Sequence, residues 1–434
     1  MTRRSLLARA AVLALAAVAI VLLAAPARPP AASAQVPPTV TDGGVENRFP
    51  EGMTFRVSAA SDSDIQQLRL RYTVLPDGTA AIGDAQFQPG KSVRGVFELE
   101  GNNPPKIYLP PGTTIRYHWE ATDADGDTAK SAPATFVYED IRFEWKSIAE
   151  NGVTVNYYSG SEEDARSMLA VASETIASMS DLLGTTVEFP VKVWIYDSVA
   201  DMRPALAKRS ATFEQSIITA GVRVSSDTVL VLGNVAYDTL RHELTHVVTA
   251  VAGESAFGTL PAWLDEGTAV YGQRDPGGYR ADLERAVSRG NVLSVRSLTS
   301  YPGDPAAVEL FYGESWSLVS FLNDQYGPEK FAQLFAEIKK GKRIDKALEI
   351  VYGFDQDGLE DEWRAVMDLP ARQTPLPRTP AATAAPGGTP APTFAPSDGD
   401  GATSAATILA LAAGVLVLAG LVGVGGIIVA KRYR

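Results

Sequence analysis

The periodicity of apolar residues changes near residue 141, and this change constrains the fold more than any other feature of the sequence. Between residues 36 and 140, apolar and polar residues alternate, as in Gln66–Val74 and Thr114–Thr122. This period is typical of strands with one buried face. From residue 141 onward, strand-like runs mix with segments of helical period, and beyond residue 235 helical segments dominate. The pattern predicts an all-β region over 36–140 and an α+β region over 141–368.

The all-β region is predicted to be a sandwich. Further strand candidates are Met53–Ala59, Ser92–Leu99 and Ala134–Tyr138, and turn residues such as Pro76-Asp77-Gly78 separate the strands. Strands at this spacing over about 100 residues favour an immunoglobulin- or fibronectin-like β-sandwich.

Two features of this region bear on function. Residues Asp123–Asp127 (DADGD) resemble the start of a calcium loop, but the later Glu of such a loop is missing and Asp-Gly is a common hairpin turn. The pattern favours a turn over a calcium site. His118 lies in a strand between Tyr117 and Trp119, which favours a surface or inter-domain histidine over a metal ligand.

The N-terminus predicts an export signal over residues 1–34. Arg3, Arg4 and Arg9 precede an apolar run over 11–25, and a small-x-small cleavage site follows at 32–34. The two adjacent arginines also resemble a twin-arginine motif, so the export route stays open.

The C-terminus predicts a membrane anchor. Residues 405–430 carry no charge and are long enough for a single transmembrane helix, and residues 431–434 are basic, which places them in the cytoplasm. The Pro- and Thr-rich segment 369–404 predicts a stalk. We therefore expect a single-pass protein of the cell membrane, with residues 36–368 outside.

Composition excludes several kinds of chemistry. The chain has no Cys, which excludes disulfides, thiolate zinc sites and Cys nucleophiles. It has three His, at 118, 242 and 246. Its net charge of −12 argues against binding to nucleic-acid phosphates, so no nucleic-acid partner is expected.

Two of the three histidines form an HExxH motif. His242 and His246 are four residues apart, so on a helix both imidazoles can reach one metal ion. Glu243 lies beside them and could take a proton from a metal-activated water. Asp238 and Gly253 are suited to begin and end this helix.

A catalytic zinc site needs a third protein ligand. The third His of the metzincin pattern is absent, because Ala252 occupies its position, and the remaining histidine lies in the β region. A three-ligand Zn2+ site would therefore need a carboxylate. Glu266 is the candidate: it shares a helix face with Trp263 and Val270, and an inward carboxylate requires a partner such as a metal.

The sequence HELTH, followed after 19 residues by Glu266 within WLDEG, resembles the gluzincin zinc metallopeptidases, the thermolysin-like grouping. Residues 141–368, about half the chain, are similar to the bacterial peptidase MA-like families, which also carry a later segment like FYGESWSL at 311–318. The resemblance implies an α+β gluzincin-type metallopeptidase domain that hydrolyses a peptide or protein substrate. It implies that His242, His246 and Glu266 bind Zn2+ and that Glu243 is the general base.

The resemblance also suggests an oxyanion donor and a substrate strand. Tyr312 is the first candidate for the donor and Tyr271 the second. The strand Thr228–Leu232 corresponds to the edge strand that pairs with an extended substrate.

One position departs from the thermolysin pattern. Such an enzyme carries an acid four residues after the ligand Glu, and here that position is Val270. Another group must therefore orient the histidines. Asp265 is expected to orient a ligand or to lie at the surface, and not to bind the metal.

Two other functions stay open. The chain could be a catalytically inactive pseudo-peptidase that acts as a cell-surface binding module. It could also be a cell-surface structural protein with a vestigial domain. Retention of Glu243 with all three candidate ligands favours the enzyme.

Overall fold

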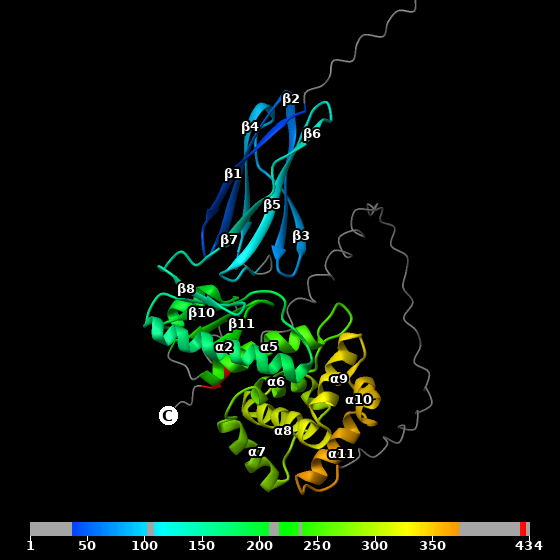
Figure 1. Cartoon of the computed structure of the whole chain (residues 1–434). Coiled ribbons are helices and arrows are strands. Elements are labelled where there is room, and N and C mark those ends of the chain that lie inside the picture. Colours follow the sequence, from blue (N-terminus) through cyan, green and yellow to red (C-terminus); the bar gives the residue numbers. More distant parts are fainter. Residues whose placement is uncertain (1–36, 102–107, 208–216, 234–236, 373–425, 431–434) are drawn as a thin grey trace, which may run out of the picture.

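The computed structural model describes residues 37–101, 108–207, 217–233, 237–372 and 426–430. Within them the chain forms two halves that lie end to end (Figure 1). The N-terminal half is all β. The other half begins with a second sheet covered by helices and continues into a cluster of helices.

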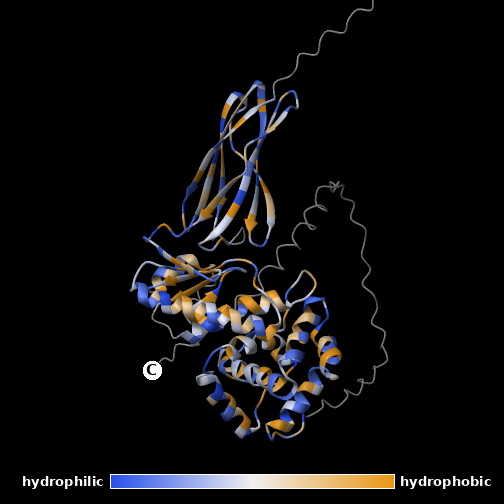
Figure 2. Cartoon of the chain, viewed as in Figure 1, coloured by the Kyte–Doolittle hydropathy of each residue, from blue (hydrophilic) through white to orange (hydrophobic). Residues whose placement is uncertain are grey.

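Seven strands of the described chain form one sheet built around β2 (Gly52–Leu75). The first part of β2 pairs with β1 and β4, and its second part pairs with β3 and β5, always antiparallel. Hydrophilic and hydrophobic residues alternate along these strands (Figure 2). The other strands are β1 (Thr39–Asn47), β3 (Thr79–Asp84), β4 (Gly90–Glu100), β5 (Thr113–Asp123), β6 (Thr128–Lys130) and β7 (Ala134–Tyr138).

The predicted immunoglobulin- or fibronectin-like sandwich is wrong in how its strands connect. Met53–Ala59 and Gln66–Val74, predicted as separate strands, belong to one strand, so the hydrogen-bonded sheet continues through β2. No Gly or Pro lies between residues 60 and 65, where the pairing register of β2 shifts. The sheet therefore bends there instead of ending. Phe55 packs edge-on against Tyr117 of β5, with ring centroids 5.0 Å apart.

The second sheet has the order β13-β11-β12-β10-β9-β8 among the described residues. β9, β10 and β12 run parallel, whereas β8 and β11 are antiparallel to their neighbours. Because β12 lies between β10 and β11, the predicted substrate-binding edge strand Thr228–Leu232 is an internal strand, and all five of its residues are buried. The bounds are β8 (Lys146–Glu150), β9 (Val153–Tyr157), β10 (Val191–Tyr196), β11 (Ile217–Arg223), β12 (Thr228–Leu232) and β13 (Gly426–Ala430).

Helix boundaries follow the sequence signals closely. α2 (Glu162–Leu183) begins at a capping box, in which the Ser161 side chain accepts from the Asp164 backbone N–H and the Asp164 side chain accepts in return. α5 (Tyr237–Gly253) ends at the predicted Gly253, although Asp238 lies within its first turn. The other helices are α3 (Val199–Met202), α6 (Ala262–Tyr271), α7 (Gly278–Arg289), α8 (Val308–Tyr326), α9 (Pro328–Lys339), α10 (Ile344–Tyr352) and α11 (Gln356–Val366).

The predicted fold class included a single C-terminal transmembrane helix. This prediction is wrong for the residues that the structure describes. Residues Gly426–Ala430, the end of the predicted helix 405–430, form strand β13, which pairs antiparallel with β11. Ile and Val favour strands, and a short apolar run does not distinguish helix from strand. Among the described residues, no helix combines the length and apolar character that crossing a bilayer requires.

Several terminal predictions lie outside the described residues. These are the signal over 1–34, most of the stalk over 369–404, the span 405–425 and the basic tail 431–434. They stay predictions from the sequence.

Aromatic side chains join the two halves. Trp194 and Tyr196 of β10 belong to the same buried cluster as Trp119 of the first sheet. The Lys192 ammonium donates to the carbonyl of Gly112 at 2.7 Å, and the Tyr196 hydroxyl donates to the buried Asp140 carboxylate at 2.9 Å. One continuous apolar core therefore crosses the junction.

Helix α6 lies directly against helix α8 because Gly267 has no side chain. A Cβ at Gly267 would overlap the backbone carbonyl of Ser315 on α8. A backbone group cannot move aside as a flexible side chain can. The glycine therefore sets the distance between the two helices.

We expect Gly267→Ala to lower the free energy of unfolding by about 1–3 kcal/mol, since overpacking must push α6 away from α8. The matched control is Gly278→Ala on α7, where a Cβ would have nothing within 4 Å. That control should be neutral or stabilising by up to about 1 kcal/mol. Denaturant unfolding measures both, and equal stabilities of the two variants would contradict this account of the interface.

Candidate metal centre

Helix α5 carries the three buried side chains of the HExxH motif. His242 and Glu243 are 0% exposed and His246 is 1% exposed. The two histidines are four residues apart, so their rings project from the same face of the helix. Their Nε2 atoms lie 3.2 Å apart.

Helix α6 brings a carboxylate to the same point. The helix starts after Pro261, which occupies the N-cap position, and places Glu266 among fully buried residues. Oε2 of Glu266 lies 3.2 Å from His242 Nε2 and 3.4 Å from His246 Nε2. Within the described chain, these three residues are the group whose ligand atoms converge closely enough to hold a metal ion.

The carboxylates of this cluster are kept ionised by the histidines beside them. Burial alone would raise the pKa of Glu266, but the two imidazoles hold it well below its ordinary value. Burial would likewise raise the pKa of Asp265, and His246 lowers it. Both carboxylates are therefore ionised inside the protein, where unpaired charge is costly.

The pKa values of the two histidines are shifted in opposite directions. Burial lowers the pKa of His242. Burial also acts against protonation of His246, but the carboxylates of Asp265 and Glu266 raise its pKa well above the ordinary value. Two imidazole nitrogens and one carboxylate oxygen that converge on one point fit the donor set of a zinc ion with three protein ligands.

Two polar groups orient the imidazoles from behind. His242 Nδ1 lies 2.9 Å from the side-chain amide of Gln273, and His246 Nδ1 lies 3.0 Å from Asp265 Oδ1. The Asp265 carboxylate also accepts from the Thr249 hydroxyl at 2.5 Å. For Nε2 of a histidine to face a metal with its lone pair, Nδ1 must carry the proton and donate it to an acceptor. The Asp265 carboxylate is such an acceptor for His246. The Gln273 atom beside His242 Nδ1 is the amide nitrogen, which is a donor, so Gln273 accepts this proton only with its amide turned to present Oε1. Asp265 thus fills for His246 the role for which Val270 is unsuited.

Glu243 is held against the sheet. Its Oε2 accepts a hydrogen bond from the Arg223 backbone N–H of β11 at 2.9 Å. β11 can approach this closely because of Gly221, where a Cβ would lie 3.0 Å from Glu243 Cγ and 2.7 Å from Thr239 Cγ2. The acid is thereby fixed beside the histidines, on the side of the sheet.

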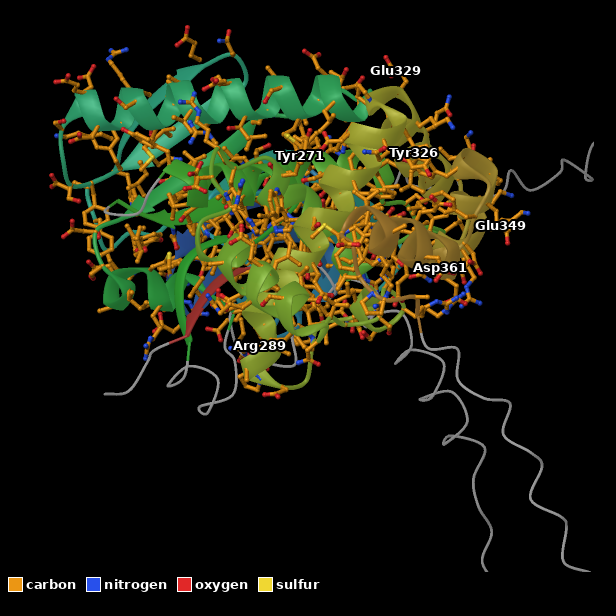
Figure 3. All side chains as sticks on the ribbon, turned by 90° about the horizontal axis from the view of Figure 1, so that it is seen from below. Tyr271, Arg289, Tyr326, Glu329, Glu349 and Asp361 are labelled. Carbon is orange, nitrogen blue, oxygen red and sulfur yellow. The ribbon has the colours of Figure 1, made fainter. Side chains whose placement is uncertain are left out.

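The predicted oxyanion donors differ in position. The Tyr312 ring lies 6.1 Å from the His242 ring and stacks on Tyr279 at 5.0 Å. Its hydroxyl is buried and has no hydrogen-bond partner among the residues that the structure describes. Tyr271 lies among the helices of the second half (Figure 3), where burial and then the carboxylate of Asp324 raise its pKa. The structure thus places the Tyr312 ring beside the metal ligand His242.

A tyrosine that the sequence analysis missed also reaches the centre. The Tyr301 hydroxyl donates a short hydrogen bond to Oε1 of Glu266. Burial and then the neighbouring carboxylates of Glu266 and Asp265 raise the pKa of Tyr301 far above its ordinary value, so the hydroxyl keeps its proton. Neither Tyr301 nor Gln273 belongs to a local sequence pattern that could have identified it.

The other candidate sites of the β region stay apart from this centre. The side chain of His118 is 29% exposed, and its Nε2 lies 3.5 Å from Glu120 on the same strand. The Asp123 carboxylate accepts from the backbone N–H groups of Asp125 and Asp127 and from the Ser61 hydroxyl. Its oxygens therefore hold a turn, as the Asp-Gly pattern indicated.

Comparison with known proteins identifies the second half of the chain. Residues 171–368 match the family model described as the Peptidase MA superfamily. No curated protein matches the sequence.

Among solved structures, the chain is similar to an M1 zinc metallopeptidase from Deinococcus radiodurans at 13% identity, over 75% of this chain and 92% of that one, with a TM-score of 0.36. It is also similar to the Br derivative of BhCBM56 at 13% identity, over 23% and 90% of the two chains, with a TM-score of 0.16. A third similarity is to a catalytically inactive OgpA from Akkermansia muciniphila in complex with an O-glycopeptide, at 12% identity, over 25% and 32% of the chains, with a TM-score of 0.19.

Because all three TM-scores are below 0.5, the assignment rests on the family match. That match begins within α2 and leaves the first sheet uncovered. The match includes His242, Glu243, His246 and Glu266. The region from residue 171 to residue 368 is therefore similar to the peptidase MA superfamily.

Proposed function

We propose that this protein is a gluzincin-type zinc metallopeptidase that hydrolyses peptide bonds with Glu243 as general base. The observation that carries the proposal is the buried convergence of His242, His246 and Glu266, with Glu243 next to the first histidine. The match of residues 171–368 to the peptidase MA superfamily supports the same reaction class.

The ion would be held by Nε2 of His242, Nε2 of His246 and Oε2 of Glu266. When bound, zinc supplies Lewis-acid polarisation of the scissile carbonyl and makes water a better nucleophile near neutral pH. Glu243 takes a proton from the attacking water as the new C–O bond forms. It returns that proton to the departing nitrogen as the C–N bond breaks.

Tyr312 is proposed to stabilise the developing oxyanion. Its hydroxyl is buried without a partner among the described residues, so it is free to donate to a substrate oxygen. Burial, and then the nearby Glu266 carboxylate, raises the pKa of Tyr312 well above its ordinary value, so the hydroxyl keeps the proton it would donate.

The substrate backbone is proposed to lie along β11, in place of the internal strand β12. β11 is the strand that touches Glu243, through the Arg223 backbone N–H. Its outer edge is paired with β13, antiparallel from Ile217 to Val222, so a substrate strand would take the place of β13. An extended peptide can bind such an edge by strand addition, which favours peptides over small-molecule substrates.

We also propose that the protein acts outside the cytoplasm, on the basis of the export signal predicted at residues 1–34. The predicted location at the cell membrane rests on the sequence of the termini alone.

Glu243→Gln should retain about one zinc per chain and lose at least about 100-fold in hydrolysis, because the proton acceptor is gone while the ligands remain. Zinc is measured by metal analysis, and cleavage by mass spectrometry of new amino termini in a denatured protein mixture. The matched control Glu284→Gln, on the exposed face of α7, should behave as wild type. Cleavage unchanged in Glu243→Gln would contradict the mechanism, and zinc binding without any wild-type cleavage would favour the inactive pseudo-peptidase.

Glu266→Ala should lose zinc on dialysis against a weak chelator, because one of three ligands is removed. The neighbouring Asp265→Ala should keep zinc with an affinity reduced by about 10- to 100-fold, since this side chain only orients His246. Metal content and chelator competition distinguish the two variants. The opposite order of affinities would mean that the ligand is Asp265.

Tyr312→Phe should lower kcat by about 100- to 1,000-fold with zinc content unchanged, the effect expected for removal of one oxyanion donor. Tyr271→Phe is the matched control and should retain wild-type kcat. Loss of activity in Tyr271→Phe alone would transfer the role to that residue.

A further inference from the structure

The two oxygens of the Glu266 carboxylate have different partners. Oε2 faces the two imidazoles, at 3.2 Å from His242 Nε2 and 3.4 Å from His246 Nε2. Oε1 accepts the short hydrogen bond from the Tyr301 hydroxyl. The tyrosine thus determines which oxygen is available to a metal ion.

Tyr301 reaches this point from the surface. The residue is 47% exposed, although the Glu266 that it contacts is fully buried. The ring packs on Phe311 of α8, with ring centroids 5.5 Å apart. The aromatic ring therefore extends from the surface to the metal centre. Its hydroxyl, the one polar group of the side chain, lies at the inner end.

The segment that carries Tyr301 is anchored to the helical core. It follows η2 (Ser297–Thr299), in which Leu298 is 1% exposed. The Thr299 hydroxyl donates to the side-chain carbonyl of Gln356 on α11 at 3.0 Å. An anchored segment can hold a hydroxyl at a fixed position without a large loss of conformational entropy on binding.

Groups that hydrogen-bond to metal ligands orient those ligands and tune metal affinity. A carboxylate with both oxygens available can bind a metal through one or both of them. A hydroxyl that occupies one oxygen leaves a single oxygen for the metal, and so preserves an open coordination position for water or substrate.

We propose that Tyr301 is a positioning residue of the metal centre: by holding Oε1 of Glu266, it presents Oε2 alone to the ion and strengthens metal binding. This inference rests on the metal site of the proposed function, but it requires no catalytic step. Its test therefore uses metal binding and spectroscopy of the purified full chain.

Tyr301→Phe keeps the ring on Phe311 and removes only the hydroxyl. It should lower zinc affinity by about 10- to 100-fold in competition with a chromophoric chelator. The matched control is Tyr352→Phe on α10, whose buried hydroxyl has no hydrogen-bond partner among the described residues and whose ring packs against Tyr326 and Phe354. The control should bind zinc as wild type does.

Two further readouts separate positioning from a loss of fold. The thermal midpoint of metal-free Tyr301→Phe should equal that of the metal-free wild type, while the increase produced by zinc should shrink. In the cobalt-substituted protein, the visible absorption of the variant should weaken, because a carboxylate free to bind through both oxygens raises the coordination number.

Equal zinc affinity and equal cobalt spectra in Tyr301→Phe and wild type would overturn the inference while leaving the proposed function intact. A wild-type chain that binds no zinc would instead overturn the proposed function. A variant with a lower metal-free midpoint and an unchanged cobalt spectrum would assign Tyr301 a packing role only, and would equally reject the positioning role.

Discussion

The contact between Glu266 and two imidazoles is the interaction on which the rest of this site depends. A buried carboxylate without a positive partner is costly, and here the histidines of α5 hold its pKa well below the ordinary value. The charge of Glu266 can be buried only if α5 and α6 lie close together in one orientation. The packing of the helical half is therefore tied to the geometry of the metal centre.

Two glycines permit that geometry. Gly267, next to the ligand, lets α6 lie against the backbone of α8, and Gly221 lets β11 approach Glu243. Gly267 is adjacent in the chain to the candidate ligand Glu266, and Gly221 packs against the candidate base Glu243. The close approach of α6 to the α8 backbone and of β11 to the Glu243 side chain fixes the ligand and the base. Tyr301, Gln273 and Asp265 then fix the orientation of the individual side chains.

The local chemistry of the site could be predicted from the sequence, but its surroundings could not. The helical spacing of His242 and His246 and the inward position of Glu266 are local properties, so the sequence alone predicts that they converge. Tyr301 and Gln273 lie in loops, and no periodicity of the sequence predicts that these loops reach the site. For the fold, the α+β half and the end of α5 at Gly253 were predictable. The continuity of β2 depends on tertiary bending, and the place of β12 inside the sheet depends on strand order, so neither follows from local pattern.

The central claim is that His242, His246 and Glu266 form one zinc site. X-ray absorption spectroscopy of the zinc-loaded full chain tests it most directly. The account predicts a first shell of nitrogen and oxygen at about 2.0–2.2 Å, with outer-shell scattering from two imidazoles. A first shell of oxygens without imidazole scattering, or with the signal of a single imidazole, would contradict it.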